Sequence, residues 1–208
     1  MKNSARLSAA VLALTLSLGP AGAQYAFAGP EKGSVGVSSV HIDNFGRVDA
    51  NYYRGAQPQG RDYADLAALG VKTIINLTSD DALAEEKGMV EQAGMKYQQI
   101  PMTTHAIPTM AQLTEFFTVV NDPASQPVYV HCVGGRHRTG VMTAAYRINH
   151  DGWTSDQAFK EMKQFKFGAD FLHSEFKQFV FGYPAALRAA AAAAGPVAGP
   201  LVKPGGQQ

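Results

Sequence analysis

The segment PVYVHCVGGRHRTG, residues 127–140, decides the fold and contains the only cysteine of the chain, Cys132. It opens with a short apolar run typical of a buried strand and continues as a loop with two glycines. It then leads into a stretch where apolar residues recur at helical spacing. In open α/β sheets, ligand sites lie beyond the carboxyl ends of the strands. The segment therefore places Cys132 at such an edge, directly before a helix.

Strand and helix patterns alternate along the chain before this loop, and Thr109 is suited to begin one of the helices. Two further helices are expected after the helix that follows the loop. Such alternation predicts a single α/β domain whose central, mostly parallel sheet is flanked by helices. The expected strands are residues 72–77, 96–102 and 127–130, and the expected helices outside the segment are residues 81–94, 108–122, 154–165 and 171–183.

Length and composition limit the architecture and the partners. With 208 residues, 46% of them apolar, the chain is long enough for one domain with a substantial core. Eighteen Lys and Arg residues balance seventeen Asp and Glu residues, leaving a net charge of +1. This balance does not indicate nucleic acid or an anionic membrane as a partner, so any affinity for anions is expected to be local.

The N-terminus has the order of a secretory signal peptide. Lys2 and Arg6 precede an apolar run over residues 7–18, and the small residues 21–23 follow. This run is shorter than the roughly 20 residues that span a bilayer, which argues against a membrane anchor. No stable membrane insertion is expected after cleavage of the signal peptide. We expect residues 1–23 to be removed and the protein to be exported, either to a periplasm or to the medium.

The rest of the chain divides by composition into three parts. Residues 24–47 are rich in Gly, Ser and Val and read as an N-terminal lead-in, and residues 48–184 carry the strand and helix patterns. Residues 185–208 are rich in Ala, Gly and Pro, which predicts a helix extension that frays into a disordered tail. A linker to a surface or a partner is the alternative for this tail.

A lone cysteine in an exported protein is informative, because cysteines in oxidising compartments usually pair as disulfides. Cys132 is therefore either a small buried hydrophobic residue or a reactive thiol. Metal binding is disfavoured, since zinc sites need several Cys or His ligands at short spacing. We expect neither a metal nor a cofactor.

The loop has the residues needed to bind a tetrahedral anion. Gly134 and Gly135 permit a backbone nest of N–H groups, to which the positive end of the following helix adds. The same groups lower the pKa of Cys132 and favour the thiolate. Arg138 can bind two anion oxygens with its planar guanidinium. The Thr139 hydroxyl can cap the helix or hydrogen-bond the sulfur and stabilise it as a leaving group.

HCVGGRHRTG resembles the H-C-x-x-G-x-x-R-[ST]-G signature of the cysteine-dependent protein tyrosine and dual-specificity phosphatases. Arg136-His137-Arg138 is similar to the Lys-His-Arg of atypical dual-specificity phosphatases of plants and fungi. NYYRGAQP, residues 51–58, is similar to the opening of that group. The resemblance covers roughly residues 48–183 and is strongest at the loop, so residues 48–184 are expected to be a phosphatase domain.

The resemblance implies a protein tyrosine phosphatase-like fold and a metal-independent phosphatase. Cys132 would attack phosphorus and form a phosphocysteine that water hydrolyses, while Arg138 and the loop N–H groups hold the phosphoryl oxygens. His131 would help to hold and tune the thiolate from behind the loop. The implied substrates are phosphorylated proteins or inositol phosphates. The residues expected to bind the phosphoryl group are Val133, Gly134, Gly135, Arg136, His137 and Arg138.

Three residues have two interpretations each. Arg136 adds positive charge at the rim of the loop, which would favour substrates with several phosphates, such as inositol phosphates or phosphoinositides. The alternative is a solvated surface arginine. Arg54 and Gln57 either face the site or belong to a turn at Gln57-Pro58.

The sequence departs from the family where many members carry an aspartate as general acid. The loop after residues 96–102 reads TTHAIPTM and has no Asp or Glu. The candidates for proton donation are His137, within the signature, and His105, in the usual acid loop, and His137 is favoured. A phosphate dianion would raise the pKa of either.

Two other classes remain open. A pseudophosphatase would bind phosphorylated ligands without turnover, as the missing carboxylate suggests, although the intact Cys132 and Arg138 argue against it. A rhodanese-like sulfurtransferase or an arsenate reductase would also use a cysteine loop at a strand end. The former usually has a shorter loop, and the latter usually needs additional cysteines.

Overall fold

Five strands form a sheet in the order β1-β2-β5-β3-β4 in the computed structural model, which describes residues 40–79 and 81–194. The first pair, β1 and β2, is antiparallel, and every other pair is parallel. The strands are β1 (Gly46–Arg47), β2 (Tyr52–Gly55), β3 (Thr73–Asn76), β4 (Lys96–Gln99) and β5 (Val128–His131).

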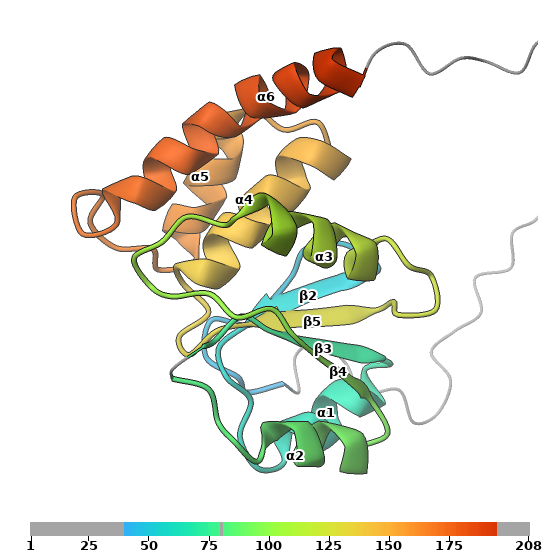
Figure 1. The fold of residues 1–208 in the computed structure, drawn as a ribbon. Helices are drawn as coiled ribbons and strands as arrows, with labels where there is room; N and C mark the ends of the chain where they lie inside the picture. The colour runs from blue at the N-terminus through green and yellow to red at the C-terminus, as the bar shows by residue number, and fades with distance from the viewer. Residues whose placement is uncertain (1–39, 80, 195–208) are drawn as a thin grey trace, which may run out of the picture. The chain divides into compact units, whose positions relative to one another are not determined.

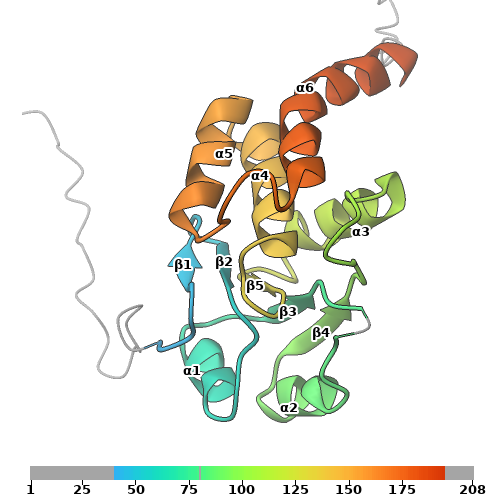
Figure 2. The same ribbon diagram turned by 90° about the vertical axis from the view of Figure 1, so that its left-hand side faces the viewer.

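Helices cover both faces of this sheet (Figure 1). Two short helices, α1 (Asp62–Ala68) and α2 (Glu86–Gln92), lie on one face. The other four, α3 (Met110–Val120), α4 (Arg138–His150), α5 (Ser155–Gln164) and α6 (Ser174–Ala194), lie on the opposite face. Figure 2 shows the same separation from the side, with α4 between α5 and α3. The mostly parallel sheet and the flanking helices confirm the predicted α/β architecture.

The central strand β5 shows why the sheet needs both layers. Its residues are all buried, and successive side chains point to opposite faces. Val128 and Val130 belong to the hydrophobic core under α3–α6, whereas Tyr129 belongs to the core under α1 and α2. Because β5 is buried on both faces, its sequence up to Val130 is a continuous apolar run and not an alternation of apolar and polar residues.

Most predicted elements are present, and most of them have shorter bounds than predicted, whereas α6 continues to Ala194. Thr109 caps α3 in a capping box with Gln112, as predicted. The helix predicted from residue 81 begins only at Glu86, because residues 81–85 form turns and Asp81 is engaged elsewhere. No sequence pattern predicted α1, β1 or β2. These elements are short, and β2 buries the charged Arg54 completely, which disguises the strand pattern.

The structure also bears on the predicted boundaries. Val40 and Ile42 are buried in the core, and β1 begins at Gly46, so the folded domain starts before residue 48. The predicted signal peptide, residues 1–23, lies outside the described residues, as do residues 195–208 of the tail. The expected helix extension is seen in α6 as far as Ala194. Among the described residues, no helix has both the length and the apolar character to cross a membrane.

Candidate active site

Residues 132–137 form the signature loop between the end of β5 and the start of α4. Gly135 in this loop has a φ of 63°, and a Cβ there would lie 2.3 Å from the carbonyl carbon and oxygen of Gly55. Only glycine combines that conformation with that approach. A Cβ on Gly134 would instead meet the flexible Arg136 side chain at 3.4 Å. The loop is thus packed directly against the end of β2.

The Cys132 thiol is buried at the base of this loop, with 3% of the residue exposed. Burial by itself would raise the pKa of the thiol. The neighbouring Thr139, through its hydroxyl and its backbone N–H, outweighs that effect together with the charge of Arg138 and the backbone N–H of Arg136, and the pKa is lowered. This is the direction that the sequence predicts, and it favours the nucleophilic thiolate.

Arg138 begins α4 with its side chain almost fully buried, and two loops from other strands contact it. Its Nη1 and Nη2 donate to the two carboxylate oxygens of Asp81 at 2.8 and 2.6 Å, and Nη1 also donates to the Met102 carbonyl at 3.1 Å. The hydrogen bonds and charge of Arg138 are the main cause that lowers the pKa of Asp81, so this carboxyl is ionised at neutral pH. Asp81 follows β3 and Met102 follows β4, so both approach from the carboxyl edge of the sheet.

A buried polar network supports the loop from behind. His131 is fully buried, and its Nε2 lies 3.0 Å from Oε1 of Glu86, which is also fully buried. Glu86 accepts hydrogen bonds from Gln57 at 2.6 Å and Asn76 at 2.5 Å. Burial would raise the pKa of Glu86, but His131, Gln57 and Tyr63 lower it overall. This position of His131 fits the supporting role that the resemblance implies.

The Gly135 carbonyl is held by two side chains from the start of the domain. Arg54 Nη2 donates to it at 2.8 Å, and Asn44 Nδ2 donates to it at 2.9 Å. The backbone N–H of Gln57 donates to the Val133 carbonyl at 3.1 Å. Hydrogen bonds to these two carbonyls hold the loop from the β2 side. Arg54 therefore contacts the loop through its side chain, and Gln57 contacts it through its backbone.

His137 is close to the site, but its side chain is engaged with another loop. Its Nε2 lies 3.0 Å from the Phe167 carbonyl, and its ring packs on the rings of Phe167 and His173. Burial, followed by the neighbouring His173, lowers the pKa of His137 despite the Phe167 contact. The pKa of His137 is therefore lowered in the unliganded protein, whereas bound phosphate is expected to raise it. The contacts favour a role for His137 in shaping the loop.

His105 lies on the loop between β4 and α3, with 78% of its side chain exposed. Its Nδ1 is 4.0 Å from Oε1 of Glu175, at the start of α6. The structure thus places this candidate proton donor on the expected loop, beside α6.

Arg136 lies at the rim of the loop with 46% of its side chain exposed. Its Nη2 is 3.8 Å from Asp43, whose other carboxylate oxygen contacts Lys166 at 2.5 Å. Two cations therefore flank one carboxylate beside the signature loop.

Three residues that complete this site were not predicted from the sequence. Asn44, Asp81 and Glu86 contact the signature loop, Arg138 and His131, respectively. Asp81 is 57 positions from Arg138, and no local pattern marks it. An acidic residue at a helix start, as at Glu86, ordinarily indicates only a favourable helix dipole.

Comparison with known families agrees with this geometry. The model of the family described as "DSP-PTPase phosphatase fused to NAD+ Kinase" matches residues 37–178. The chain belongs to this phosphatase family. The match begins before residue 40 and includes the sheet, the signature loop and α5.

Individual relatives share about 30% of their residues with this chain over the matched region. The dual specificity protein phosphatase TpbA of Pseudomonas aeruginosa is 30% identical over 125 residues, which cover 60% of this chain and 56% of TpbA. The inositol diphosphatase SIW14 of Saccharomyces cerevisiae is 28% identical over 130 residues, which cover 60% of this chain and 46% of SIW14. The chain therefore spans about half the length of these relatives.

Solved structures show the same fold. The crystal structure of P. aeruginosa TpbA has a TM-score of 0.61 and 28% identity, covering 72% of this chain and 91% of that one. The core catalytic domain of SIW14, crystallised with citrate, has a TM-score of 0.61 and 24% identity, covering 75% of this chain and 96% of that one.

Proposed function

We propose that this protein is a metal-independent phosphatase that hydrolyses phosphomonoesters through a phosphocysteine intermediate. The observation that carries the proposal is the arrangement around Cys132. A buried thiol with a lowered pKa lies at the end of β5, with Thr139 and Arg138 at the start of α4 beside it. This arrangement combines a nucleophile with groups that stabilise negative charge.

Each residue has a defined task in this reaction. The Cys132 thiolate attacks phosphorus in line, the S–P bond forms, and the P–O bond to the leaving group breaks. Arg138 and the loop N–H groups bind the phosphoryl oxygens where charge collects. Water then attacks phosphorus and releases inorganic phosphate, and the Thr139 hydroxyl stabilises the departing thiolate.

Asp81 imposes a condition on substrate binding. Both terminal nitrogens of Arg138 are bonded to Asp81 in the unliganded protein. A phosphate dianion must share these nitrogens with the carboxylate or displace it. Because 39% of the Asp81 side chain is exposed, solvent can screen the pair and the carboxylate can move away.

We propose phosphotyrosine or phosphoserine and phosphothreonine proteins as the first substrate class. TpbA, a relative of this chain, has been solved in complex with phosphotyrosine. The second class is inositol phosphates or phosphoinositides, which the two rim cations Arg136 and Lys166 favour. The relative SIW14 is named as an inositol diphosphatase. A panel of phosphopeptides and inositol phosphates, compared by kcat/KM, would separate the two classes.

The decisive experiment is the release of phosphate from an aryl phosphate in the presence of EDTA. We expect turnover by the wild-type protein and none by Cys132→Ser. Binding of phosphate ligands without turnover by the wild-type protein would instead assign the chain to the pseudophosphatases. Sulfur transfer to cyanide or reduction of arsenate would assign it to the other cysteine-loop enzymes.

We further propose that the protein is exported, to a periplasm or to the medium. The support is the order of charge, apolar run and small residues in the first 23 positions. N-terminal sequencing of the protein from culture fractions tests this proposal, and an intact N-terminus in the cytoplasmic fraction would contradict it.

A further inference from the structure

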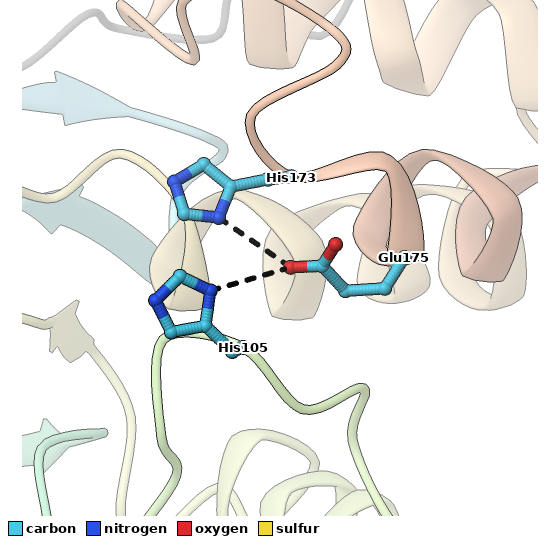
Figure 3. A group of neighbouring side chains, drawn as sticks. All are labelled: His105, His173 and Glu175. Carbon is cyan, nitrogen blue, oxygen red and sulfur yellow. Dashed lines mark ion pairs between the residues drawn. The ribbon is translucent and has the colours of Figure 1, made fainter.

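A group of two histidines and one carboxylate lies beside the signature loop, and only one member, His105, is also a candidate proton donor. His105 extends from the loop between β4 and α3, whereas His173 and Glu175 lie just before and within the start of α6. In Figure 3 both imidazole rings turn toward one oxygen of the Glu175 carboxylate. Three ligand-type atoms from two separate segments therefore converge.

Two of these atoms are buried without the hydrogen bonds that buried polar atoms normally have. Nδ1 of His173 and Oε1 of Glu175 face each other at 3.4 Å. Among the residues that the structure describes, neither atom has a hydrogen-bond partner. The His173 side chain is only 12% exposed, so water has restricted access to it. An unsatisfied nitrogen and carboxylate oxygen side by side are suited to a shared cation.

The spacing of the group fits a transition metal. Zinc binds imidazole nitrogen and carboxylate oxygen at about 2.0–2.2 Å, which separates the ligand atoms of a tetrahedral site by ~3.3 Å. His173 and Glu175 already have this separation, and all three ligand atoms lie within 4.8 Å of one another. Closing the longest separation requires at most ~1.5 Å of movement, which the exposed His105 side chain can supply by rotation.

We propose that His105, His173 and Glu175 form a binding site for Zn²⁺, with water completing the coordination. Two neutral imidazoles and one carboxylate are a ligand set typical of zinc with an open position. The ion would tie the loop between β4 and α3 to the start of α6. Because the ring of His173 packs on His137, at 3.8 Å between ring centroids, the site borders the signature loop.

The other group of this kind among the described residues has its ligand atoms already occupied. Asp49, His150 and Asp151 also lie within 4.8 Å of one another. However, Arg147 donates to Asp151 at 2.7 Å, and Tyr146 donates to Asp49 at 2.7 Å. The positive Arg147 would also repel a cation. This second group is therefore a matched control.

The test is a titration of the full, untagged chain with Zn²⁺ by calorimetry and with Co²⁺ by visible absorption. Cys132→Ser serves as the background, so that the thiolate cannot bind the metal. We expect one ion per chain. His105→Ala and the isosteric Glu175→Gln should each weaken binding at least ~10-fold, because removal of even an outer partner of a metal ligand costs 10- to 100-fold.

Two variants serve as controls, His150→Ala in the second group and Glu115→Gln on α3, and both should change affinity less than ~2-fold. The proposal is overturned if no ion binds, if Cys132→Ser abolishes binding seen in the wild type, or if His150→Ala weakens binding while His105→Ala does not. Circular dichroism confirms that each variant is folded. These readouts require no turnover. Loss of activity in EDTA would instead contradict the metal-independent mechanism.

Discussion

Asp81 holds Arg138 by both carboxylate oxygens, at 2.8 and 2.6 Å, although 57 positions separate the two residues in the chain. The arginine is 3% exposed and the aspartate 39% exposed, so the partner that can move is the carboxylate. In the proposed reaction, a substrate phosphate would need the Arg138 nitrogens that Asp81 occupies.

We therefore expect Asp81→Asn to bind phosphate more tightly. Because the Asp81 carboxylate is solvent-exposed, we take the pair to be worth on the order of 1 kcal/mol, which corresponds to about 5-fold in affinity. The measurement is the competitive inhibition constant of inorganic phosphate, which should fall by up to this factor. A rise in the constant would show that Asp81 instead holds Arg138 in its binding orientation.

Gly135→Ala should abolish catalysis, whereas Gly134→Ala should retain most of it. The added methyl at Gly135 would lie 2.3 Å from the Gly55 carbonyl at a φ of 63°, whereas at Gly134 it meets only a flexible side chain at 3.4 Å. Backbone strain of this kind costs about 1–3 kcal/mol, so the fold should survive with a displaced loop. Thermal unfolding and kcat/KM measured on both variants test this, and equal activity would contradict it.

Thr139→Val should raise the pKa of Cys132, because it removes the hydroxyl that most strongly opposes the effect of burial. The rate of alkylation by iodoacetamide, followed against pH, reports the thiolate fraction. The profile of Thr139→Val should shift to higher pH, and Thr139→Ser should restore the wild-type profile. Superimposable profiles for all three proteins would remove Thr139 from the activation of the thiol.

Glu86→Gln should destabilise the protein most at neutral pH. The pKa of Glu86 is lowered in the folded protein, so its ionised form contributes stability above the unfolded pKa of about 4.3. That contribution is lost as pH falls through the folded pKa. Replacing the buried carboxylate by an amide weakens the hydrogen bonds that Glu86 accepts from Gln57 and Asn76, at a cost of about 1–3 kcal/mol. Urea unfolding at pH 7 should show this difference, and it should shrink below pH 4.

His137→Ala should slow alkyl and aryl phosphate hydrolysis by the same factor, because its side chain is bonded to the Phe167 carbonyl. His105→Ala should slow the alkyl substrate more, since a poor leaving group depends most on proton donation. Assays in EDTA keep metal away from His105. A selective loss on the alkyl substrate in His137→Ala would restore the role that the sequence suggested.

The parts of the fold that the sequence predicted are those with a local pattern. The β5–α4 segment carries an apolar strand, a glycine loop and a helical repeat in one continuous stretch of sequence. Thr109 likewise has its capping partner three residues away. Asp81, Glu86 and Asn44 could not be found in this way. Their partners lie far away in the chain, and only the strand order β2-β5-β3 brings them to the loop.

The Gly135 carbonyl accepts hydrogen bonds from Asn44 and Arg54, so the shape of the loop depends on contacts with residues far away in the chain. These donors are 91 and 81 positions away. A truncation that starts at residue 48 would keep every residue of the signature and still lose one of these donors. Phosphate release can therefore serve as a sensitive assay of whether the N-terminal segment has docked during refolding.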